Sequence, residues 1–251
     1  MIQKFDVFIT PFQTMRTIHL YLPDDVETSN QHYPVIYMFD GHNLFYDEDA
    51  TYGRSWRLKD YLDEHMKVIV VGIECNHEGN KRLDEFSPYT IRNRYFEEIN
   101  GVGKELMDWV VHELKPMIDE SFPTLPQREF TMIAGSSMGG LMSVYSITAY
   151  NEFFSRAACL SSSVVMCMQQ LKKTIIEAPY FNPDTKIFLS WGSEEAKGKK
   201  KLAYHSACQL EIAHQLMEKN AQVYPYLHVG GAHNEASWEE EIPVFMDYLC
   251  R

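Results

Sequence analysis

Long apolar runs are missing from this sequence. The longest strongly apolar stretch covers residues 68–73, whereas a membrane-spanning helix needs about 20 such residues. The N-terminal residues MIQKFDVFITPF also lack the apolar core of a secretion signal. We therefore expect a soluble, cytoplasmic protein that has no membrane partner.

Basic residues are scarce. The chain carries 23 Lys and Arg against 35 Asp and Glu, which gives a formal net charge of -12. Because binding to a phosphate backbone depends on clustered Lys and Arg, this balance argues against nucleic acid as a partner. The one basic cluster, residues 197–201, follows two glutamates and is typical of a solvated helix start.

Cysteine pairs and metal motifs are also missing. The five cysteines form an odd set without a CxxC pair: Cys75, Cys159, Cys167, Cys208 and Cys250. This pattern is typical of reduced thiols in a cytosol, in the core or at the surface, that do not act as ligands. HExxH is absent, and GVGKE lacks the upstream glycine and the following Ser or Thr of a phosphate loop. We expect neither a metal nor a cofactor.

What the sequence does contain is an alternation of strand and helix patterns. Its 251 residues, 45% of them apolar, suffice for one sizeable core, so we predict a single domain over residues 1–251. Short β-branched and aromatic runs predict strands at 5–10, 17–22, 35–39, 68–74, 130–134, 157–160, 186–191 and 223–229. Apolar spacing predicts helices at 57–65, 106–117, 138–150, 168–177, 203–220 and 243–249.

This order predicts an α/β fold with a mostly parallel sheet, helices on both faces and an antiparallel start. Pro116 is expected to bend the second helix. Residues 76–95 lack periodicity and contain Gly79, Pro88 and many charges. We interpret them as a long loop of the kind that often carries function.

The stretch GSSMGG matches GxSxG through Gly135, Ser137 and Gly139. In this motif a serine occupies a sharp turn between a strand and a helix, and small neighbours are needed because the turn brings the backbone close. The strand-like EFTMIA precedes the motif and the helix-like MGGLMSVYSITAY follows it. Ser137 is therefore the predicted nucleophile, with a plain glycine-rich turn as the alternative. Ser136 does not fit, because it would need glycines where Ala134 and Met138 stand.

A serine nucleophile requires a base, and in sheets that use this motif the acid and then the histidine follow it along the chain. His205 and His214 lie in a helical pattern, and His228 lies inside a strand. His233 follows the glycines after that strand, in a loop from which an imidazole could reach the serine. We predict His233 as the base.

The third member should be a carboxylate at the carboxyl end of a strand. Only Glu194 and Glu195 directly follow one, KIFLSWGS. We favour Glu195, and Glu194 remains open. For the oxyanion, one donor should be the amide of Met138, and the other the amide of His42 or Asn43, in the loop after the third strand. A plain turn at Asp40 is the alternative for that loop.

With these residues in place, the chain resembles the Putative esterase family of α/β hydrolases, which includes feruloyl and acetyl-xylan esterases, S-formylglutathione hydrolases (esterase D) and enterochelin esterases. The matching segments are MFDGHNLF, VIVVGIECN, ELKPMID, TMIAGSSMGGLMS, WGSEE and GGAHNEASW. The resemblance implies the α/β-hydrolase fold and a serine esterase. Relatives often have an aspartate where this chain has glutamates, and commonly a proline and an aromatic where it reads SSSVVM.

The expected substrate is a small-molecule carboxylic ester, such as an acetyl or hydroxycinnamoyl ester of a carbohydrate. A thioesterase, a siderophore-ester hydrolase or an acyltransferase could use the same triad, and a non-catalytic binding protein could keep the fold. The sequence also leaves open whether the chain forms a homo-oligomer. Candidate substrate-binding residues are Trp56, Asn76, Arg82 and Trp238. Core packing for the aromatics, or a solvated loop position for the arginine, is the alternative.

Overall fold

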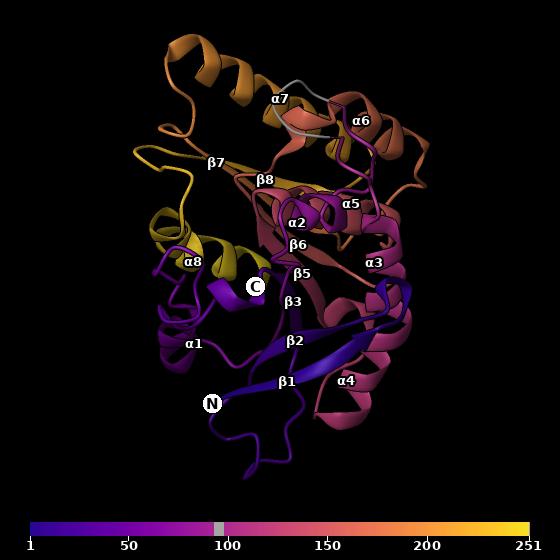
Figure 1. Cartoon of the computed structure of the whole chain (residues 1–251), viewed down its shortest axis with the longest axis vertical. Helices are drawn as coiled ribbons and strands as arrows, with labels where there is room; N and C mark the ends of the chain where they lie inside the picture. Colours follow the sequence, from indigo (N-terminus) through magenta and orange to yellow (C-terminus); the bar gives the residue numbers. More distant parts are fainter. Residues whose placement is uncertain (93–97, 251) are drawn as a thin grey trace. The chain divides into compact units, whose positions relative to one another are not determined.

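The computed structural model describes residues 1–92 and 98–250 of the chain. They form two compact units, Met1–Met132 and Ile133–Arg251, which we describe separately. Figure 1 shows both units in the colours of the sequence. Among the described residues, no helix is both long enough and apolar enough to cross a bilayer.

The first unit contains four strands in the order β1-β2-β4-β3. Their bounds are β1 (Ile2–Ile9), β2 (Thr14–Tyr21), β3 (Val35–Phe39) and β4 (Ile69–Ile73). β1 pairs with β2, and β2 with β4, in antiparallel fashion, whereas β3 and β4 are parallel. Every residue of β3 and β4 is buried, as expected for parallel strands covered on both faces.

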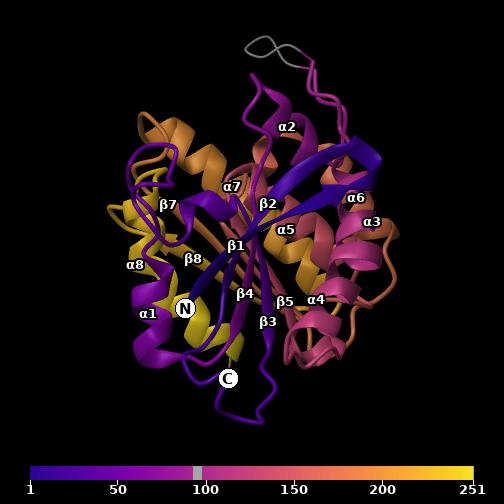
Figure 2. The ribbon, with the colours of Figure 1, turned by 60° about the horizontal axis from the view of Figure 1, so that its bottom comes forward.

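The helices of the first unit are α1 (Leu58–His65), α2 (Lys81–Glu85), α3 (Gly103–Trp109) and α4 (Lys115–Ser121). Figure 2 shows α1 on the opposite side of β3 and β4 from α3 and α4. A π-helical turn, Val110–Leu114, joins α3 to α4. A 3₁₀ turn, Gly41–Asn43, follows β3.

The second unit contains β5 (Thr131–Ser136, whose first two residues belong to the first unit), β6 (Arg156–Leu160), β7 (Lys186–Gly192) and β8 (Gln222–His228), adjacent in that order. β6, β7 and β8 are parallel, and the last pairing aligns Gly192 with His228. The helices are α5 (Met138–Ala149), α6 (Met168–Glu177), α7 (Lys199–Glu218) and α8 (Glu235–Cys250). In Figure 1, α8 lies on the opposite side of β6 and β7 from α5 and α6.

These elements confirm the predicted α/β class, the antiparallel start and the mostly parallel strands that follow. α5 is buried from Met138 to Thr148, because it is apolar on all sides and contains the small residues needed for close packing. β8 is more exposed than β5, β6 and β7. The expectation of a single domain stays a prediction.

Several boundaries differ from the sequence-based expectations; β1, β2 and α7, for example, each begin three or four residues earlier than predicted. The predicted loop at 76–95 contains the short helix α2, and its residues 93–95 lie outside the described part of the chain. The second helix departs from α geometry at Val110–Leu114, and Pro116 lies within the first turn of α4, where proline is tolerated. The last helix begins at Glu235, with Pro243 inside it. Proline favours the first turn of a helix, which made residue 243 a misleading start signal.

The close packing of α5 on β6 gives a stability prediction. A Cβ added at Gly140 would lie 2.6 Å from the backbone oxygen of Leu160, an atom that cannot move aside easily. We expect Gly140→Ala to lower the free energy of unfolding by about 1–3 kcal/mol, the usual cost of overpacking. Urea unfolding followed by circular dichroism measures this change.

Ser146→Ala in the same helix is the matched control. Its Oγ is buried and has no hydrogen-bond partner among the described residues, so removing it costs no internal bond. We expect a change of less than about 0.5 kcal/mol. Equal destabilisation by both substitutions would contradict the packing argument.

Candidate active site

Ser137 occupies a strained turn between β5 and α5. Its backbone angles are φ 57 and ψ -117, in a region that residues other than glycine rarely adopt. Two backbone hydrogen bonds hold Ser137 there, each at 3.0 Å. The N–H of Ser137 donates to the carbonyl of Leu160, and the carbonyl of Ser137 accepts from the N–H of Ser163. Ser136, by contrast, is the buried last residue of β5. The turn therefore distinguishes the two serines in the way the GxSxG motif predicts.

The glycines of the motif allow this turn because the backbone folds closely on itself. A Cβ on Gly135 would lie 2.8 Å from the carbonyl carbon of Gly139. Met138 begins α5, so its amide lies in the first turn of a helix, where N–H groups have no acceptor within the helix. This end of α5 also carries the positive part of the helix dipole. Both features suit a group that develops negative charge near Ser137.

Glu195 and His233 meet in loops that follow adjacent parallel strands. Nδ1 of His233 lies 3.2 Å from Oε2 of Glu195. The two loops are also joined through their backbones, because the N–H of Ser193 donates to the carbonyl of His228 and that of Glu194 to the carbonyl of Gly231, each at 2.9 Å. The pairing occurs here because β7 and β8 end at the same level.

Glu194 differs from Glu195 in its surroundings. Its side chain is exposed, whereas the side chain of Glu195 is only 12% exposed. Oε1 of Glu195 accepts hydrogen bonds from the Ser161 hydroxyl at 2.6 Å and from the Gly192 amide at 2.5 Å. Of the two glutamates left open by the sequence, Glu195 is the one that contacts His233.

The charge of Glu195 is stabilised where it lies. Burial by itself would raise the pKa of this carboxyl, but its hydrogen bonds with His233, Ser161 and Gly192 outweigh burial and lower the pKa below its ordinary value. Glu195 is therefore ionised at neutral pH. An ionised carboxylate can hold the Nδ1–H tautomer of His233 and leave Nε2 as the basic nitrogen.

Two further residues in this network were not assigned to it from the sequence. Nε1–H of Trp238 donates to Oγ of Ser161 at 2.7 Å, and that hydroxyl in turn donates to Glu195. The ring of Trp238 also packs edge-on against His233, at 5.3 Å between centroids. Trp238, proposed from the sequence to bind substrate, is only 5% exposed and supports the acid and the base. The segment SSSVVM, in which this chain departs from its relatives, was the available signal for Ser161.

The other three histidines of the second unit lie elsewhere. His228 ends β8 and pairs with Glu240 and Glu241 of α8, at 3.1 and 3.2 Å. His205 and His214 lie on α7, as the helical pattern predicted, and His214 is exposed. Among the described residues, only His233 has a carboxylate partner in the loop after β7.

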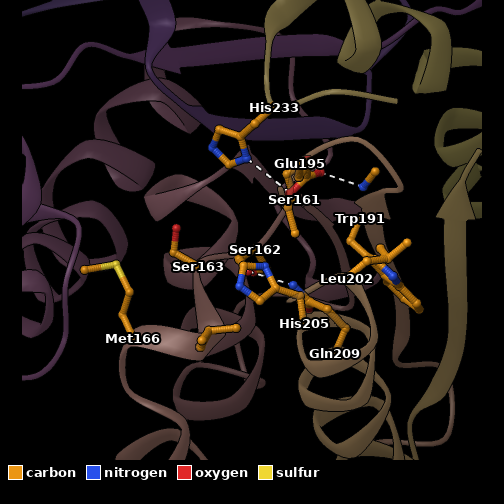
Figure 3. Close-up of a pocket in the computed structure, with 13 residues that line it drawn as sticks. Ser161, Ser162, Ser163, Met166, Trp191, Glu195, Leu202, His205, Gln209 and His233 are labelled. Carbon is orange, nitrogen blue, oxygen red and sulfur yellow. Dashed lines mark hydrogen bonds and ion pairs between the residues drawn. The ribbon is translucent and has the colours of Figure 1, made fainter. Parts of the chain in front are cut away.

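A cavity of about 300 Å³ adjoins the Glu195–His233 pair (Figure 3). Ser163, whose amide binds the carbonyl of Ser137, is in its wall, so the cavity begins beside the strained turn. Met166, Trp191 and Leu202 supply apolar surface. Ser162 and Gln209 also line the cavity, and each has a buried polar atom, Oγ and Oε1, without a hydrogen-bond partner among the described residues. The cavity can therefore hold an apolar group beside residues that have unused polar atoms.

The remaining sequence-predicted residues belong to the first unit. His42 and Asn43 lie in the 3₁₀ turn after β3, where the amide of Asn43 donates to the carbonyl of Asp40 at 2.9 Å. Of the two amides predicted as the second oxyanion donor, that of Asn43 thus has an acceptor within its own turn. Asp40 is more than a turn residue, because its buried carboxylate binds Arg82 through two hydrogen bonds of 2.7 and 2.6 Å. That pairing lowers the pKa of Asp40 despite its burial.

Three of the proposed substrate-binding residues have protein partners here. The guanidinium of Arg82 is bound to Asp40, and Trp56 is only 2% exposed. Nδ2 of Asn76 donates to Glu85 at 3.3 Å, and Asn76 also lines a cavity of about 340 Å³ within the first unit. The part of Asn76 in substrate binding stays a prediction, as do those of Trp56 and Arg82.

Comparisons with known proteins cover almost the whole chain. Residues 10–247 match the profile of the family described as "Putative esterase". The uncharacterized protein YbbA of Bacillus subtilis (strain 168) is 25% identical over 207 residues, which are 81% of this chain and 78% of YbbA.

Solved structures with the same fold include two hydrolases. An IroE-like serine hydrolase from Shewanella oneidensis aligns with a TM-score of 0.77 and 19% identity, over 99% of this chain and 79% of that one. The enterobactin esterase FES from Shigella flexneri aligns with a TM-score of 0.73 and 17% identity, over 99% of this chain and 57% of that one. The fold of the chain is thus the α/β-hydrolase fold, and the chain belongs to the Putative esterase family as a carboxylic ester hydrolase.

Proposed function

We propose that the chain hydrolyses carboxylic esters through a Ser137–His233–Glu195 triad and an acyl-enzyme. Ser137 attacks the ester carbonyl while Nε2 of His233 takes its proton, and His233 then returns that proton to the leaving alcohol. Glu195 orients the imidazole through Nδ1 and stabilises its charged form. A water molecule activated by His233 then cleaves the acyl-enzyme. The amides of Met138 and His42 are the proposed oxyanion donors.

One observation carries this proposal: a carboxylate with three hydrogen-bond partners holds the imidazole of His233 at 3.2 Å, in the unit that also contains the strained Ser137. If the Glu195–His233 pair served only stability, the unit would not need a serine in a strained turn. If the Ser137 turn served only stability, the unit would not need an imidazole oriented by a carboxylate. The two features together are what a serine hydrolase requires.

The cavity beside the pair favours an aromatic acyl group that carries a hydroxyl. Trp191 and Met166 offer the apolar surface that packs against a ring, and the buried, unpartnered Oε1 of Gln209 can accept a hydrogen bond from a ring hydroxyl once its side chain turns toward the cavity. Among the expected acyl groups, hydroxycinnamoyl fits this cavity better than acetyl does. We therefore propose hydroxycinnamoyl esters, with a carbohydrate as the alcohol.

A siderophore ester is the second candidate substrate. The likeness to the enterobactin esterase FES favours it, and a hydroxylated aromatic acyl group would use the same features of the cavity. Parallel assays with a feruloyl ester, a catecholate trilactone and a thioester separate the candidates. A thioester preferred by more than about tenfold in kcat/KM would contradict both.

Ser137→Ala should abolish turnover, because no other group supplies the nucleophile. We expect kcat to fall by about 10⁴- to 10⁶-fold and labelling by a fluorophosphonate probe to disappear. Ser136→Ala is the control and should keep its labelling, because Ser136 ends β5 and does not occupy the strained turn. Labelling lost in the Ser136 variant and kept in the Ser137 variant would overturn the assignment.

Glu195→Gln keeps the shape of the side chain and removes the charge that stabilises the imidazolium. We expect kcat on an aryl acetate to fall by about 10³- to 10⁴-fold with little change in KM. Glu194→Gln, at the neighbouring exposed position, should change kcat by less than about twofold. If Glu194→Gln causes the loss instead, the triad acid is misassigned.

Gln209→Met tests the acyl cavity with a side chain of similar volume. We expect kcat/KM for a feruloyl ester to fall by about 5- to 10-fold, the value of one hydrogen bond, and that for the unsubstituted cinnamoyl ester to change by less than about twofold. Gln170→Met, at an exposed position of α6, is the matched control. Equal losses of kcat/KM on both esters would show that Gln209 does not bind the ring hydroxyl.

A further inference from the structure

Two histidines and a cysteine come together in the first unit, and none of them belongs to the proposed triad. His42 lies in the 3₁₀ turn after β3, and Cys75 and His77 lie in the segment after β4. One ligand atom from each lies within 4.8 Å of those of the other two. Imidazole nitrogen and thiolate sulfur are the ligands that Zn²⁺ prefers in proteins.

The buried imidazole of His42 has a nitrogen that the protein leaves unused. His42 is only 5% exposed, and its Nε2 lies 2.9 Å from Oγ1 of Thr51. Its Nδ1 is buried and has no hydrogen-bond partner among the described residues. A buried polar atom left without a partner destabilises the fold, so a ligand that satisfied Nδ1 would stabilise this arrangement.

His77 is oriented in the same manner as a metal-bound histidine. Its Nε2 lies 2.6 Å from Oε1 of Glu74, and only an N–H can make that contact with a carboxylate. The lone pair of the imidazole is then on Nδ1. Metal-bound histidines commonly donate their other ring N–H to a carboxylate in this way, because the contact fixes the ring and increases its basicity. The rings of His42 and His77 are 4.7 Å apart between centroids, edge to face.

Cys75 completes the group, and a cavity gives access to it. The thiol is 3% exposed and is hydrogen-bonded to Asp40. A cavity of about 240 Å³ has Cys75 and His77 in its wall, together with the carboxylates of Glu74 and Glu78. Glu78 is paired with Lys81, so Glu74, which is bound by His19 and His77, supplies the negative charge that would attract a cation. Arg16, which also lines the cavity, is paired with Glu85 at 2.8 Å, so its charge is compensated.

We propose that His42, Cys75 and His77 bind a Zn²⁺ ion. On binding, the S–H bond of Cys75 breaks, its proton is released to solvent, and the sulfur forms a bond to the metal while both imidazoles bind through neutral nitrogens. Ligand atoms around zinc lie about 3.3–3.8 Å apart for bonds of about 2.0–2.3 Å, so small side-chain rotations complete the site. The fourth position faces the cavity and takes water.

The spacing of the three ligands along the chain explains why the sequence did not suggest this site. Cys75 and His77 are separated by one residue, and the third ligand comes from a different loop, so the group matches none of the CxxC or HExxH spacings. The proposed ion would join the turn after β3 to the segment after β4. It would bind the side chain of His42 and leave its amide available for the oxyanion role.

The test uses the full chain, stripped with a chelator and then titrated with Zn²⁺ or Co²⁺. We expect about one metal ion retained per chain after gel filtration, measured by mass spectrometry of the metal. The Co²⁺ form should show a thiolate-to-cobalt charge-transfer band. Cys75→Ser should lose that band, and both Cys75→Ser and His77→Asn should bind Zn²⁺ at least about tenfold more weakly. Cys250→Ser and His65→Asn, outside the group, should bind as the unmodified chain does.

A second measurement does not depend on whether the variants fold. In the unmodified chain, Zn²⁺ should slow alkylation of Cys75 and leave that of Cys250 unchanged, as read by peptide mass spectrometry. No retained Zn²⁺ together with no protection of Cys75 would overturn the proposal. So would equal binding by the Cys75 and Cys250 variants, and binding of Cu⁺ without Zn²⁺ would overturn the choice of metal.

Discussion

The parallel pairing of β7 with β8 is the constraint on which the candidate active site depends. The register aligns Gly192 with His228, so both strands end at the same level and the loops after them start side by side. Backbone hydrogen bonds between the two loops then bring Glu195 to His233. A shift of register by one residue would displace the acid from the base and turn the side chains of the strand to the opposite face.

A chain of hydrogen-bonded side chains holds this pair. Trp238 donates to Ser161, Ser161 donates to Glu195, and Glu195 binds His233, so each side chain holds the next one in position. In a low-dielectric interior such a chain is strong when every member has a partner. The carboxylate stays charged because hydrogen bonds replace the water that burial removes.

Two of the buried polar atoms that have no partner among the described residues are informative. Oε1 belongs to Gln209, which lines the cavity of the second unit, and Nδ1 belongs to His42, which is grouped with Cys75 and His77 in the first. An unsatisfied buried polar atom is costly in a core that serves only stability. The first observation supports an aromatic acyl group with a hydroxyl, and the second supports a bound metal ion.

The sequence alone predicted every strand of the described chain, the α/β class and the family, because these follow from periodicity and from motifs that are local along the chain. It also separated Ser137 from Ser136, since the glycine spacing belongs to a single turn. It placed the start of the last helix too late, because Pro243 is a strong local signal that the packing of Trp238 and Ile242 overrides.

Only the tertiary structure decided the contacts between residues that are distant in sequence. Glu194 and Glu195 follow the same strand, and the sequence favoured Glu195 without excluding Glu194. In the structure the side chain of Glu194 is exposed, whereas that of Glu195 contacts His233 and Ser161. The sequence likewise did not predict the contact of Trp238 with the base or the grouping of His42 with Cys75. Such contacts depend on strand register and loop closure, which no local pattern of residues encodes.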